Sequence, residues 1–339
     1  MDINLNKNIR SRNRDALPED TESMKQGIQN KEVAILSRVI TLIEHKNLLR
    51  NPRLISFLSE LPESQTSTRI AITGPPGVGK STFIEALGLE LIHQGFSVAV
   101  LAIDPASQRS KGSILGDKTR MEKLSKSSKA FIRPSSNALE SGGVRNSLLP
   151  TIKICETAKF DFILVETVGV GQSELEVGKM TDIMLLLLNP SGGDELQGIK
   201  RGIVEMADLI LINKGDGALM EAAESSRRAY ANALHFNAEP HHLLGKIEVQ
   251  VISSITQRGI PELAQKLIEY SKDKKLRIRI NKKRKAQEQE WFEKQAKEML
   301  YISLSENKEV SEKIEELSKG GDIYANLSAF DKFINAKFK

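Results

Sequence analysis

The stretch from Arg69 to Gly95 reads RIAIT, then GPPGVGKST, then FIEALGLELIHQG, and it decides the fold. A short apolar run typical of a buried strand leads into a glycine-rich loop, and the loop leads into a helical pattern. The loop matches G-x-x-x-x-G-K-[ST] in the strand-loop-helix context that this phosphate-binding motif requires. A plain turn between a strand and a helix is the alternative, and the complete context disfavours it. The stretch predicts a nucleoside triphosphate site.

Each part of this loop has a physical role in holding phosphate. Glycines let the chain curl so that main-chain NH groups face the phosphate oxygens, and the helix N-terminus adds partial positive charge. The Lys80 ammonium is expected to reach the outer phosphates, and the Ser81 hydroxyl is placed to bind Mg²⁺. The expected nucleotide-binding residues of the loop are Gly74, Pro75, Pro76, Gly77, Val78, Gly79, Lys80, Ser81 and Thr82.

Six strand-like apolar runs alternate with helical patterns downstream of Arg69: RIAIT, SVAVLAID, DFILVET, DIMLLLLN, DLILIN and EVQVISS. Near-continuous apolar strands of this kind are typical of a parallel sheet that is buried on both faces. The last helix of this pattern is PELAQKLIEYSKD, and no strand-like run follows Lys274. The middle of the chain is therefore expected to be an open α/β domain.

The segments that flank this domain are predicted to be helical or irregular. The first ~30 residues are polar and are expected to form a mobile arm. A helix follows, in which Leu36, Val39, Ile40 and Ile43 lie on one apolar face. The predicted domains are residues 1–55 (arm and helix), 56–273 (nucleotide-binding domain) and 274–339 (C-terminal helical extension).

The C-terminal extension is predicted from two helical segments, residues 284–304 and 308–320, with Gly320 and Gly321 as a stop and a short tail beyond them. So thin an appendix buries little surface by itself. It is expected either to pack back on the sheet domain or to associate with a second copy of the chain.

Composition limits the possible classes of protein. A chain of 339 residues exceeds the roughly 100–200 residues that one core usually serves, and 40% hydrophobic residues exclude wholesale disorder. No apolar run approaches the ~20 residues of a membrane span, and the polar start lacks a signal-peptide core, so we expect a cytoplasmic protein with no membrane contact. The single cysteine, Cys155, is expected to be a reduced packing residue.

The net charge of +5 is unevenly distributed. Residues 272–285 read KDKKLRIRINKKRK, with nine basic residues against one acidic residue. The segment could contact phosphates or an acidic partner. The absence of aromatic residues, and the Glu- and Gln-rich helix that follows, favour a solvated helix face instead, and no nucleic acid is expected as a partner.

A second motif, NKGDG at residues 213–217, follows the apolar run DLILIN and indicates which base is bound. The Asp216 carboxylate can accept hydrogen bonds from the N1 and N2 donors of guanine, whereas adenine presents an acceptor at N1. Asn213 can bond N7, and the Lys214 stem can lie over the base. Further along, main-chain NH groups of Ile252, Ser253 and Ser254 could reach the guanine oxygen. A plain turn is the alternative, but this position in the chain favours GTP over ATP.

Three carboxylates are candidates for the metal and hydrolysis machinery. Asp104 and Glu166 close two of the apolar runs, where the strands of a parallel sheet gather ligands, and Asp117 lies in an intervening loop. Glu166 and Gly169 resemble a D-x-x-G pattern with Glu in place of Asp, and Gly169 is placed to sense the γ-phosphate. A helix cap or a surface charge is the alternative for each carboxylate. The expected catalytic residues are Lys80, Asp104, Asp117 and Glu166, and the expected metal ligands are Ser81, Asp104, Asp117 and Glu166.

No glutamine is clearly placed to orient the attacking water. Gln172 lies near Gly169, but its spacing does not put it beside the water, so slow hydrolysis is expected until a partner assists. The loop at residues 190–201 combines glycines with Asp194, Glu195 and Lys200. It is interpreted equally well as a nucleotide-dependent switch or as a surface connection.

Six segments of the chain resemble, in order and spacing, the MeaB/ArgK-type GTPases that act as chaperones of adenosylcobalamin-dependent methylmalonyl-CoA mutase. They are GPPGVGKST, AIDPAS, GDKTRM, VETVGVGQSE, GGDELQGIKRGI and NKGDG. The resemblance runs from about Val33 to Ile260. The fold class that it implies is α/β: a parallel-sheet P-loop GTPase domain with an N-terminal helical arm and a C-terminal helical dimerisation extension.

The resemblance also implies a function. It indicates a GTPase, using GTP/GDP and Mg²⁺ and holding no tight cobalamin, whose cycle gates cofactor loading and protects an acyl-CoA mutase partner. It further implies a homodimer, a metal and hydrolysis role for Asp104, Asp117 and Glu166, and a partner-sensing role for residues 194–200. Many members carry Ala where this chain has Gly215. The glycine is expected to do no harm to the site, because this position contributes main chain rather than a side chain.

Two other functions stay open at this point. One is a small-molecule kinase or transport-linked ATPase, and the preference for GTP over ATP separates it from the first function. The other is a metal-delivery GTPase. The lack of a Cys/His cluster in the sequence argues against metal delivery, since His241 and His242 are interpreted as a surface pair.

Overall fold

The computed structural model describes residues 21–45, 49, 51–63, 66–103, 121–135, 143–167, 172–190, 201–235 and 243–338. The chain forms two compact units, residues 1–287 and residues 288–339. The division falls inside one long helix, α13 (Lys274–Ser305). No helix among these residues is long and apolar enough to cross a membrane.

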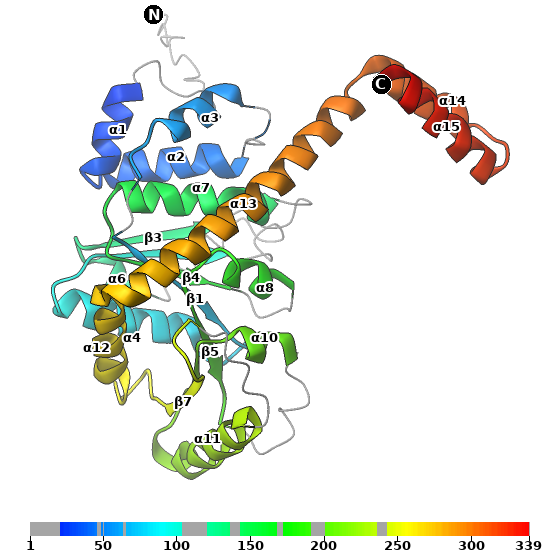
Figure 1. Ribbon diagram of the computed structural model, residues 1–339. Helices are drawn as coiled ribbons and strands as arrows, with labels where there is room; N and C mark the ends of the chain where they lie inside the picture. Colours follow the sequence, from blue (N-terminus) through cyan, green and yellow to red (C-terminus); the bar gives the residue numbers. More distant parts are fainter. Residues whose placement is uncertain are drawn as a thin grey trace, which may run out of the picture. The chain divides into compact units, whose positions relative to one another are not determined.

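The first unit is built around a seven-stranded sheet in which every pairing is parallel (Figure 1). The strand order is β3-β2-β4-β1-β5-β6-β7, so β1 lies at the centre. The strands are β1 (Thr68–Thr73), β2 (Val98–Ile103), β3 (Ala130–Ser135), β4 (Phe162–Glu166), β5 (Ile183–Leu188), β6 (Leu209–Ile212) and β7 (Glu248–Val251). This arrangement confirms the open α/β fold, and all six expected strands are present.

The strand that the sequence analysis missed is β3, reading AFIRPS, at the edge of the sheet. Pro134 lies within it and pairs in register with Ala102 of β2. Proline has no NH to donate to a ladder, so it weakens a strand pattern and is tolerated mainly at sheet edges. The edge position therefore explains both the proline and the weak signal in the sequence.

The helices account for most of the remaining described residues. They are α1 (Thr21–Gln29), α2 (Val33–His45), α3 (Pro52–Ser59), α4 (Lys80–His93), α6 (Glu122–Ser125), α7 (Gly143–Thr157), α8 (Gln172–Gly178), α10 (Arg201–Met206), α11 (Met220–His235), α12 (Ile260–Lys272), α13, α14 (Lys308–Ser318) and α15 (Ile323–Phe338), with a 3-10 turn at Gly217–Leu219.

The main core lies between the sheet and the helices α4 and α12. Alternate residues of the strands, such as Ile70 and Ile72 of β1, are fully buried against Phe83 and Leu87 of α4 and Leu263 of α12. The intervening strand residues point to the opposite face of the sheet and are buried as well. Burial on both faces is the reason that the strands read as continuous apolar runs.

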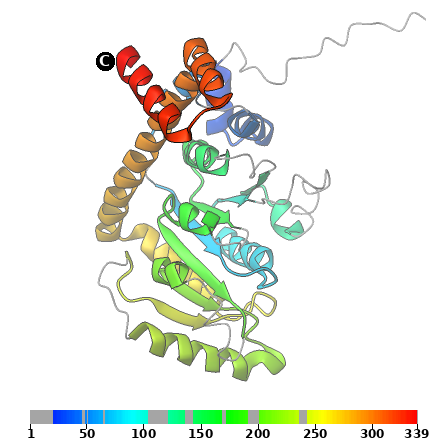
Figure 2. The ribbon, with the colours of Figure 1, turned by 90° about the vertical axis from the view of Figure 1, so that its right-hand side faces the viewer.

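The N-terminal helices gather at the β3 end of the sheet, and α11 lies along the β7 end (Figure 2). The predicted apolar face of α2 is confirmed, because Leu36, Val39, Ile40 and Ile43 are all buried, and α2 packs on α7. The expectation of an arm through residue ~30 is wrong for Thr21–Gln29, which form α1 and bury Met24 and Ile28. Two inward apolar side chains in nine residues gave too weak a periodic signal.

Cys155 lies in α7 as a free, fully buried thiol, which confirms its interpretation as a packing residue. Burial raises the pKa of this thiol far above its ordinary value, and the neighbouring charge of Glu156 acts in the same direction. The thiolate form is therefore strongly disfavoured in the folded protein.

In the second unit, α14 ends just before Gly320 and Gly321, both at positive φ, as the sequence predicts. The expected tail beyond them is a full helix, α15. Within this unit Lys337 forms an ion pair with Glu309, and α14 packs on α15. The unit leaves many large apolar side chains exposed: Phe292, Met299, Leu300, Tyr301, Ile314, Ile323, Tyr324 and Leu327.

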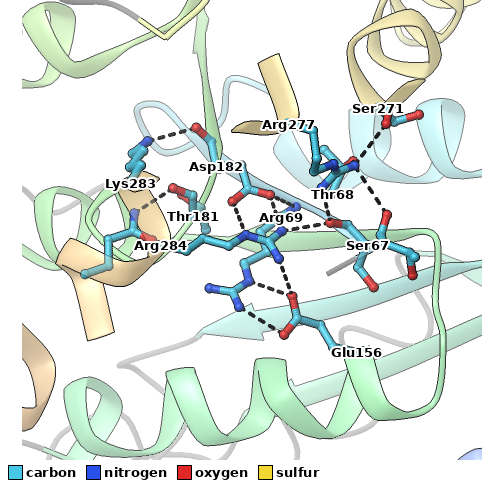
Figure 3. Close-up of polar contacts among 12 residues, drawn as sticks. Ser67, Thr68, Arg69, Glu156, Thr181, Asp182, Ser271, Arg277, Lys283 and Arg284 are labelled. Carbon is cyan, nitrogen blue, oxygen red and sulfur yellow. Dashed lines mark hydrogen bonds and ion pairs between the residues drawn. The ribbon is translucent and has the colours of Figure 1, made fainter. Parts of the chain in front are cut away.

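The basic segment at the start of α13 is not a simple solvated face (Figure 3). Arg284 is 4% exposed and binds Asp182 through two hydrogen bonds, Nε to Oδ1 at 2.7 Å and Nη2 to Oδ2 at 2.5 Å. Its Nη1 also donates to Glu156, which Arg69 binds through a second pair of bonds at 2.8 and 2.9 Å. Two cations and two carboxylates thus balance one another out of water, which is the condition for tolerating buried charge.

Two further cations of this segment, Arg277 and Lys283, also bind the sheet domain. Arg277 Nη1 donates to the Ser67 carbonyl at 3.0 Å, and Lys283 Nζ donates to the Asp182 carbonyl at 2.8 Å. Ser67 and Asp182 immediately precede β1 and β5, so these contacts lie at the opposite end of the strands from the phosphate loop. The sequence interpretation of a solvated face is wrong for this side of the helix because a linear charge count does not reveal inward-facing partners. Lys282 and Lys285 are exposed.

The nucleotide-binding site

The phosphate loop connects β1 to α4, as predicted, and its glycines are required by the geometry. Gly74 has φ +148°, and a Cβ there would lie 2.2 Å from the carbonyl oxygen of Leu187 in β5. Gly79 is left-handed at the start of α4, and a Cβ there would lie 2.9 Å from Asn213 Nδ2. Any side chain at these positions would force the loop away from the sheet.

Lys80 lies folded against its own loop. The side chain is 9% exposed, and Nζ donates to the carbonyl oxygens of Gly74 at 2.7 Å and Pro75 at 3.1 Å. Burial lowers the pKa of this ammonium, while the carboxylates of Glu166 and Glu174 raise it. The cation is thus held at the helix N-terminus, where it can exchange carbonyl partners for phosphate oxygens.

Ser81 and Glu166 meet beside the loop. The Ser81 hydroxyl donates to Glu166 Oε1 at 2.9 Å, because β4, which ends at Glu166, pairs directly with β1. A hydroxyl and a carboxylate in contact supply hard oxygen ligands, the type that Mg²⁺ prefers, so these two residues fit the expected metal. No group of three or more His, Cys, Asp or Glu side chains gathers to hold a metal ion in the described part of the chain.

Asn213 joins the phosphate loop to the guanine motif. Its Nδ2 donates to the Val78 carbonyl at 2.9 Å, and its Oδ1 accepts from the Ser254 NH at 3.2 Å and hydroxyl at 2.9 Å. All three residues are buried. The predicted base-contacting residue therefore also ties together three segments of the site.

Asp216 and Lys214 frame the expected base position. The Ser253 hydroxyl bonds to Asp216 Oδ2, which leaves the carboxylate fixed and half-buried. Lys214 has φ +59°, and its Nζ donates to the Gly77 carbonyl at 2.8 Å. The stem of this lysine therefore spans from the guanine motif to the phosphate loop.

The main-chain NH groups near β7 have partners inside the protein. Those of Ile252, Ser253 and Ser254 donate to Ile212 O, Arg258 O and Asn213 Oδ1, respectively. These hydrogen bonds hold residues 252–254, the segment after β7, in place. The expected contact of these NH groups with the guanine oxygen stays a prediction.

The surroundings of Gly215 in this chain are fitted to a glycine. A Cβ at Gly215 would lie 2.2 Å from Val251 Cγ1 and 3.1 Å from the Ile252 carbonyl oxygen. A valine methyl cannot move far because the branched side chain is stiff. The glycine is therefore matched to Val251.

Several predicted residues cannot be placed. Pro75, Pro76, Val78 and Thr82 lie in the loop or in the first turn of α4, as expected. Asp104, Asp117, Gly169, Asp194, Glu195, Lys200, His241 and His242 lie outside the described residues.

Sequence reasoning missed Glu174, which lies in α8. This carboxylate is 2% exposed, and its Oε2 has no hydrogen-bond partner among the described residues. Val177, three residues later, is buried on the same side of the helix. A seven-residue helix with two apolar residues and two glutamates gave no signal that a charged side chain turns inward.

The parallel sheet, the phosphate loop after its central strand and the NKxD motif beside that loop define a P-loop GTPase. Residues 36–309 match the family model described as methylmalonyl Co-A mutase-associated GTPase MeaB. The chain belongs to this family, and the resemblance of its sequence segments is confirmed.

Relatives with curated names agree with this assignment. The chain is 46% identical to a putative GTPase of Caulobacter vibrioides over 252 residues, 74% of this chain and 77% of the relative. It is 39% identical to GTPase ArgK of Escherichia coli K12 over 302 residues, 88% of each chain. It is 40% identical to the mitochondrial methylmalonic aciduria type A homolog of Mus musculus over 276 residues, 81% of this chain and 63% of the relative. The chain is a GTPase.

A solved structure confirms the fold. The protein described as LAO/AO transport system kinase matches with a TM-score of 0.71 and 29% identity, covering 94% of this chain and 99% of that one. The likeness therefore includes the helices on both sides of the sheet domain.

Proposed function

We propose that this GTPase is a chaperone of an adenosylcobalamin-dependent acyl-CoA mutase, with methylmalonyl-CoA mutase as its client. The observation that carries the proposal is the family match, which spans residues 36–309 and so includes the start of the C-terminal extension as well as the GTPase domain. The 40% identity to the mouse methylmalonic aciduria type A homolog supports the same client.

In this proposal the GTP cycle gates the loading of adenosylcobalamin into the mutase and protects the mutase from inactivation. The chaperone itself holds no tight cobalamin. The loop that contains Asp194, Glu195 and Lys200 senses the partner, and hydrolysis stays slow until the partner is bound. A cytoplasmic location is part of the proposal.

In this proposal, different residues of the chain bind the phosphates, the base and the metal. Lys80 and the main-chain NH groups of the loop bind the phosphates, and Asp216 binds the donor edge of guanine. Ser81 and Glu166 would hold Mg²⁺, joined by Asp104 and Asp117, while Gly169 contacts the γ-phosphate. The metal, when bound, neutralises developing charge on the phosphate oxygens.

The second unit supports the proposed homodimer. Phe292, Leu300, Tyr301, Ile323 and Tyr324 are each at least 64% exposed. Apolar side chains gathered on so small a unit are typical of a surface that associates. A second copy of the extension presents the same apolar residues and fits a two-fold interface.

The proposal is tested by mixing the protein with purified methylmalonyl-CoA mutase. We expect co-elution on size exclusion with a GTP analogue and Mg²⁺, and faster GTP hydrolysis with the mutase than without it. The Lys80→Ala variant, which cannot hold phosphate, should show no turnover in either case. The chaperone role is contradicted if the wild-type protein binds GTP but forms no complex with the mutase and shows no change in GTP turnover.

A small-molecule kinase is the second candidate, favoured by the name of the matching solved structure. The two functions predict different nucleotide use. A kinase would consume nucleotide in proportion to a phosphorylated small molecule. Turnover that releases inorganic phosphate in the absence of any acceptor molecule excludes this alternative.

A further inference from the structure

The first turns of α13, residues 274–287, carry eight basic residues and no acidic residue, and these cations divide between two sides of the helix. Arg277, Lys283 and Arg284 turn towards the sheet domain and bind oxygen atoms there (Figure 3). The other five are exposed and form a basic face on the opposite side: Lys274, Lys275, Arg279, Lys282 and Lys285.

The basic face is continuous and fixed in direction. With 3.6 residues per turn, its five residues fall within about 140° of the helix circumference and extend over about 17 Å of the helix axis. The other side of the helix is held by the buried side chains of Leu276 and Ile280 as well as by the inward cations. The rotation of the helix is therefore set, and the backbone that presents the basic face needs no ordering when a partner binds.

No acidic residue lies among the cations of the basic face. Lys275, Arg279 and Lys282 follow one another at four- and three-residue steps, the spacings at which like charges destabilise a helix. Within the described residues, no ion pair is formed by Lys274, Lys275, Lys282 or Lys285. In α14, by contrast, lysines pair with glutamates of the same helix. An uncompensated surface of one sign is complementary to a partner of the opposite charge.

Ile278 indicates what kind of acidic partner fits. It lies in the middle of the basic face and is 71% exposed. An apolar side chain surrounded by charged ones has the composition of a protein–protein contact, in which polar groups surround an apolar centre. A nucleic acid fits less well, because phosphates would meet this apolar side chain and residues 272–285 offer no aromatic ring on which bases could stack.

A membrane surface also fits less well than an acidic protein. A helix that lies in a membrane interface buries a broad apolar face in the lipid. The apolar side chains Leu276 and Ile280 of this helix are buried in the protein instead, so Ile278 alone would enter the lipid. The chemistry of the basic face therefore favours an acidic protein surface.

We propose that the basic face docks an acidic surface of the protein that this GTPase serves, which under the proposed function is the acyl-CoA mutase. The inference rests on that proposed function and adds to it the place of contact and the charge of the contacted surface. Charge attraction of this kind mainly speeds the formation of a complex and makes it sensitive to salt. The basic face includes none of the residues expected to bind nucleotide.

The double variant Lys275→Glu/Lys282→Glu reverses two charges of the basic face. Each new glutamate lies three or four residues from Arg279, an arrangement that supports a helix, so the fold should be kept. We expect the association rate with the mutase to fall about tenfold at low salt. The matched control is Arg38→Glu/Arg53→Glu, which changes the net charge by the same amount at exposed positions of α2 and α3.

The experiment uses the full-length protein with a GTP analogue and Mg²⁺, and purified methylmalonyl-CoA mutase immobilised on a biosensor. Association and dissociation are measured at ionic strengths of about 0.01 M and about 0.15 M, between which the Debye length falls from roughly 30 Å to about 8 Å. Slower association of the basic-face variant alone, with a difference that shrinks at the higher salt, supports the proposal. Equal association of this variant and the wild type, with circular dichroism and basal GTP hydrolysis unchanged, overturns it.

Three other outcomes are also decisive. Loss of self-association in the basic-face variant, with normal mutase binding, would make this face a contact between copies and overturn the proposal. Binding of a duplex DNA oligonucleotide by the wild type but not by this variant, again with normal mutase binding, overturns it in favour of nucleic acid. A wild type that binds GTP but forms no complex with the mutase contradicts the proposed function itself, so the two failures are distinct.

Discussion

The side-chain amide of Asn213 donates a hydrogen bond to the main-chain carbonyl of Val78, 2.9 Å away, and so joins two segments that lie 135 positions apart in the chain. The same amide accepts from the backbone and hydroxyl of Ser254. The loop expected to bind phosphate and the two loops expected to bind guanine therefore share one buried side chain. Disturbing either half of the site is expected to affect the other.

The first prediction follows from this shared contact. Asn213→Ala leaves the Val78 carbonyl and the Ser254 NH buried without their partner, which should lower the free energy of unfolding by about 1–3 kcal/mol. GTP binding should weaken in parallel. Urea denaturation and GTP titration measure the two effects. Lys214→Ala, which removes a contact at the exposed Lys214 tip, should leave stability nearly unchanged, and an equal loss in both variants would contradict the argument.

We propose that Asp216 sets the preference for guanine over adenine. Asp216→Asn replaces an acceptor by a group that presents a donor to guanine N1 or N2, so two charge-assisted hydrogen bonds of about 1.5 kcal/mol or more are lost and GTP binding should weaken by about 100-fold. Xanthosine triphosphate, which carries an oxygen at position 2, should gain affinity. Competition against a fluorescent GTP analogue measures both changes. Equal binding of ATP and GTP by the wild type would remove the basis for assigning guanine.

Arg284 is predicted to be essential for the stability of the sheet domain. Arg284→Ala removes the buried counter-charge of Asp182 and leaves Glu156 with Arg69 alone, which should cost about 3–5 kcal/mol of unfolding free energy. Lys285→Ala, at the next, exposed position, should change stability by less than about 0.5 kcal/mol. Chemical denaturation of the two variants is the measurement. A similar, small effect at both positions would restore the interpretation of a solvated face.

Gly215 and Val251 are predicted to be coupled. Gly215→Ala should destabilise the protein by about 1–3 kcal/mol, because its Cβ would overlap Val251 Cγ1. Val251→Ala makes room, so the double variant should be more stable than the two single effects predict by addition. A double-mutant cycle from thermal or urea unfolding measures this coupling. Strict additivity would show that the loop moves aside instead.

Cys155 is predicted to be inert while the protein is folded. Burial raises the pKa of the thiol, so the reactive thiolate is scarce. The side chain lies in α7 and is fully buried, so a reagent cannot reach it. Its reaction with a thiol reagent at pH 8 should be orders of magnitude slower in buffer than in denaturant. The labelling rate can then report global unfolding. Fast labelling without denaturant would show that α7 opens locally.

The sequence alone was enough to predict a P-loop GTPase, because the motifs that define this class are formed by residues close together in the chain. The loop at residues 74–82 needs only its own glycines, its lysine and the strand and helix on either side of it, all within Arg69–Gly95. The six apolar runs and the face of α2 are likewise periodic patterns over adjacent residues. Their order along the chain then carried the family resemblance, which the family model confirms.

Tertiary structure alone decided the features that depend on residues far apart in the sequence. The edge strand β3 exists because β2 pairs with it, despite its proline. The cations of α13 turn inward because Asp182 and Glu156 lie beneath them, and Glu174 is buried because α8 packs beside β1. A side chain's burial and its charge partners depend on which segments the fold brings together, and no local pattern encodes that.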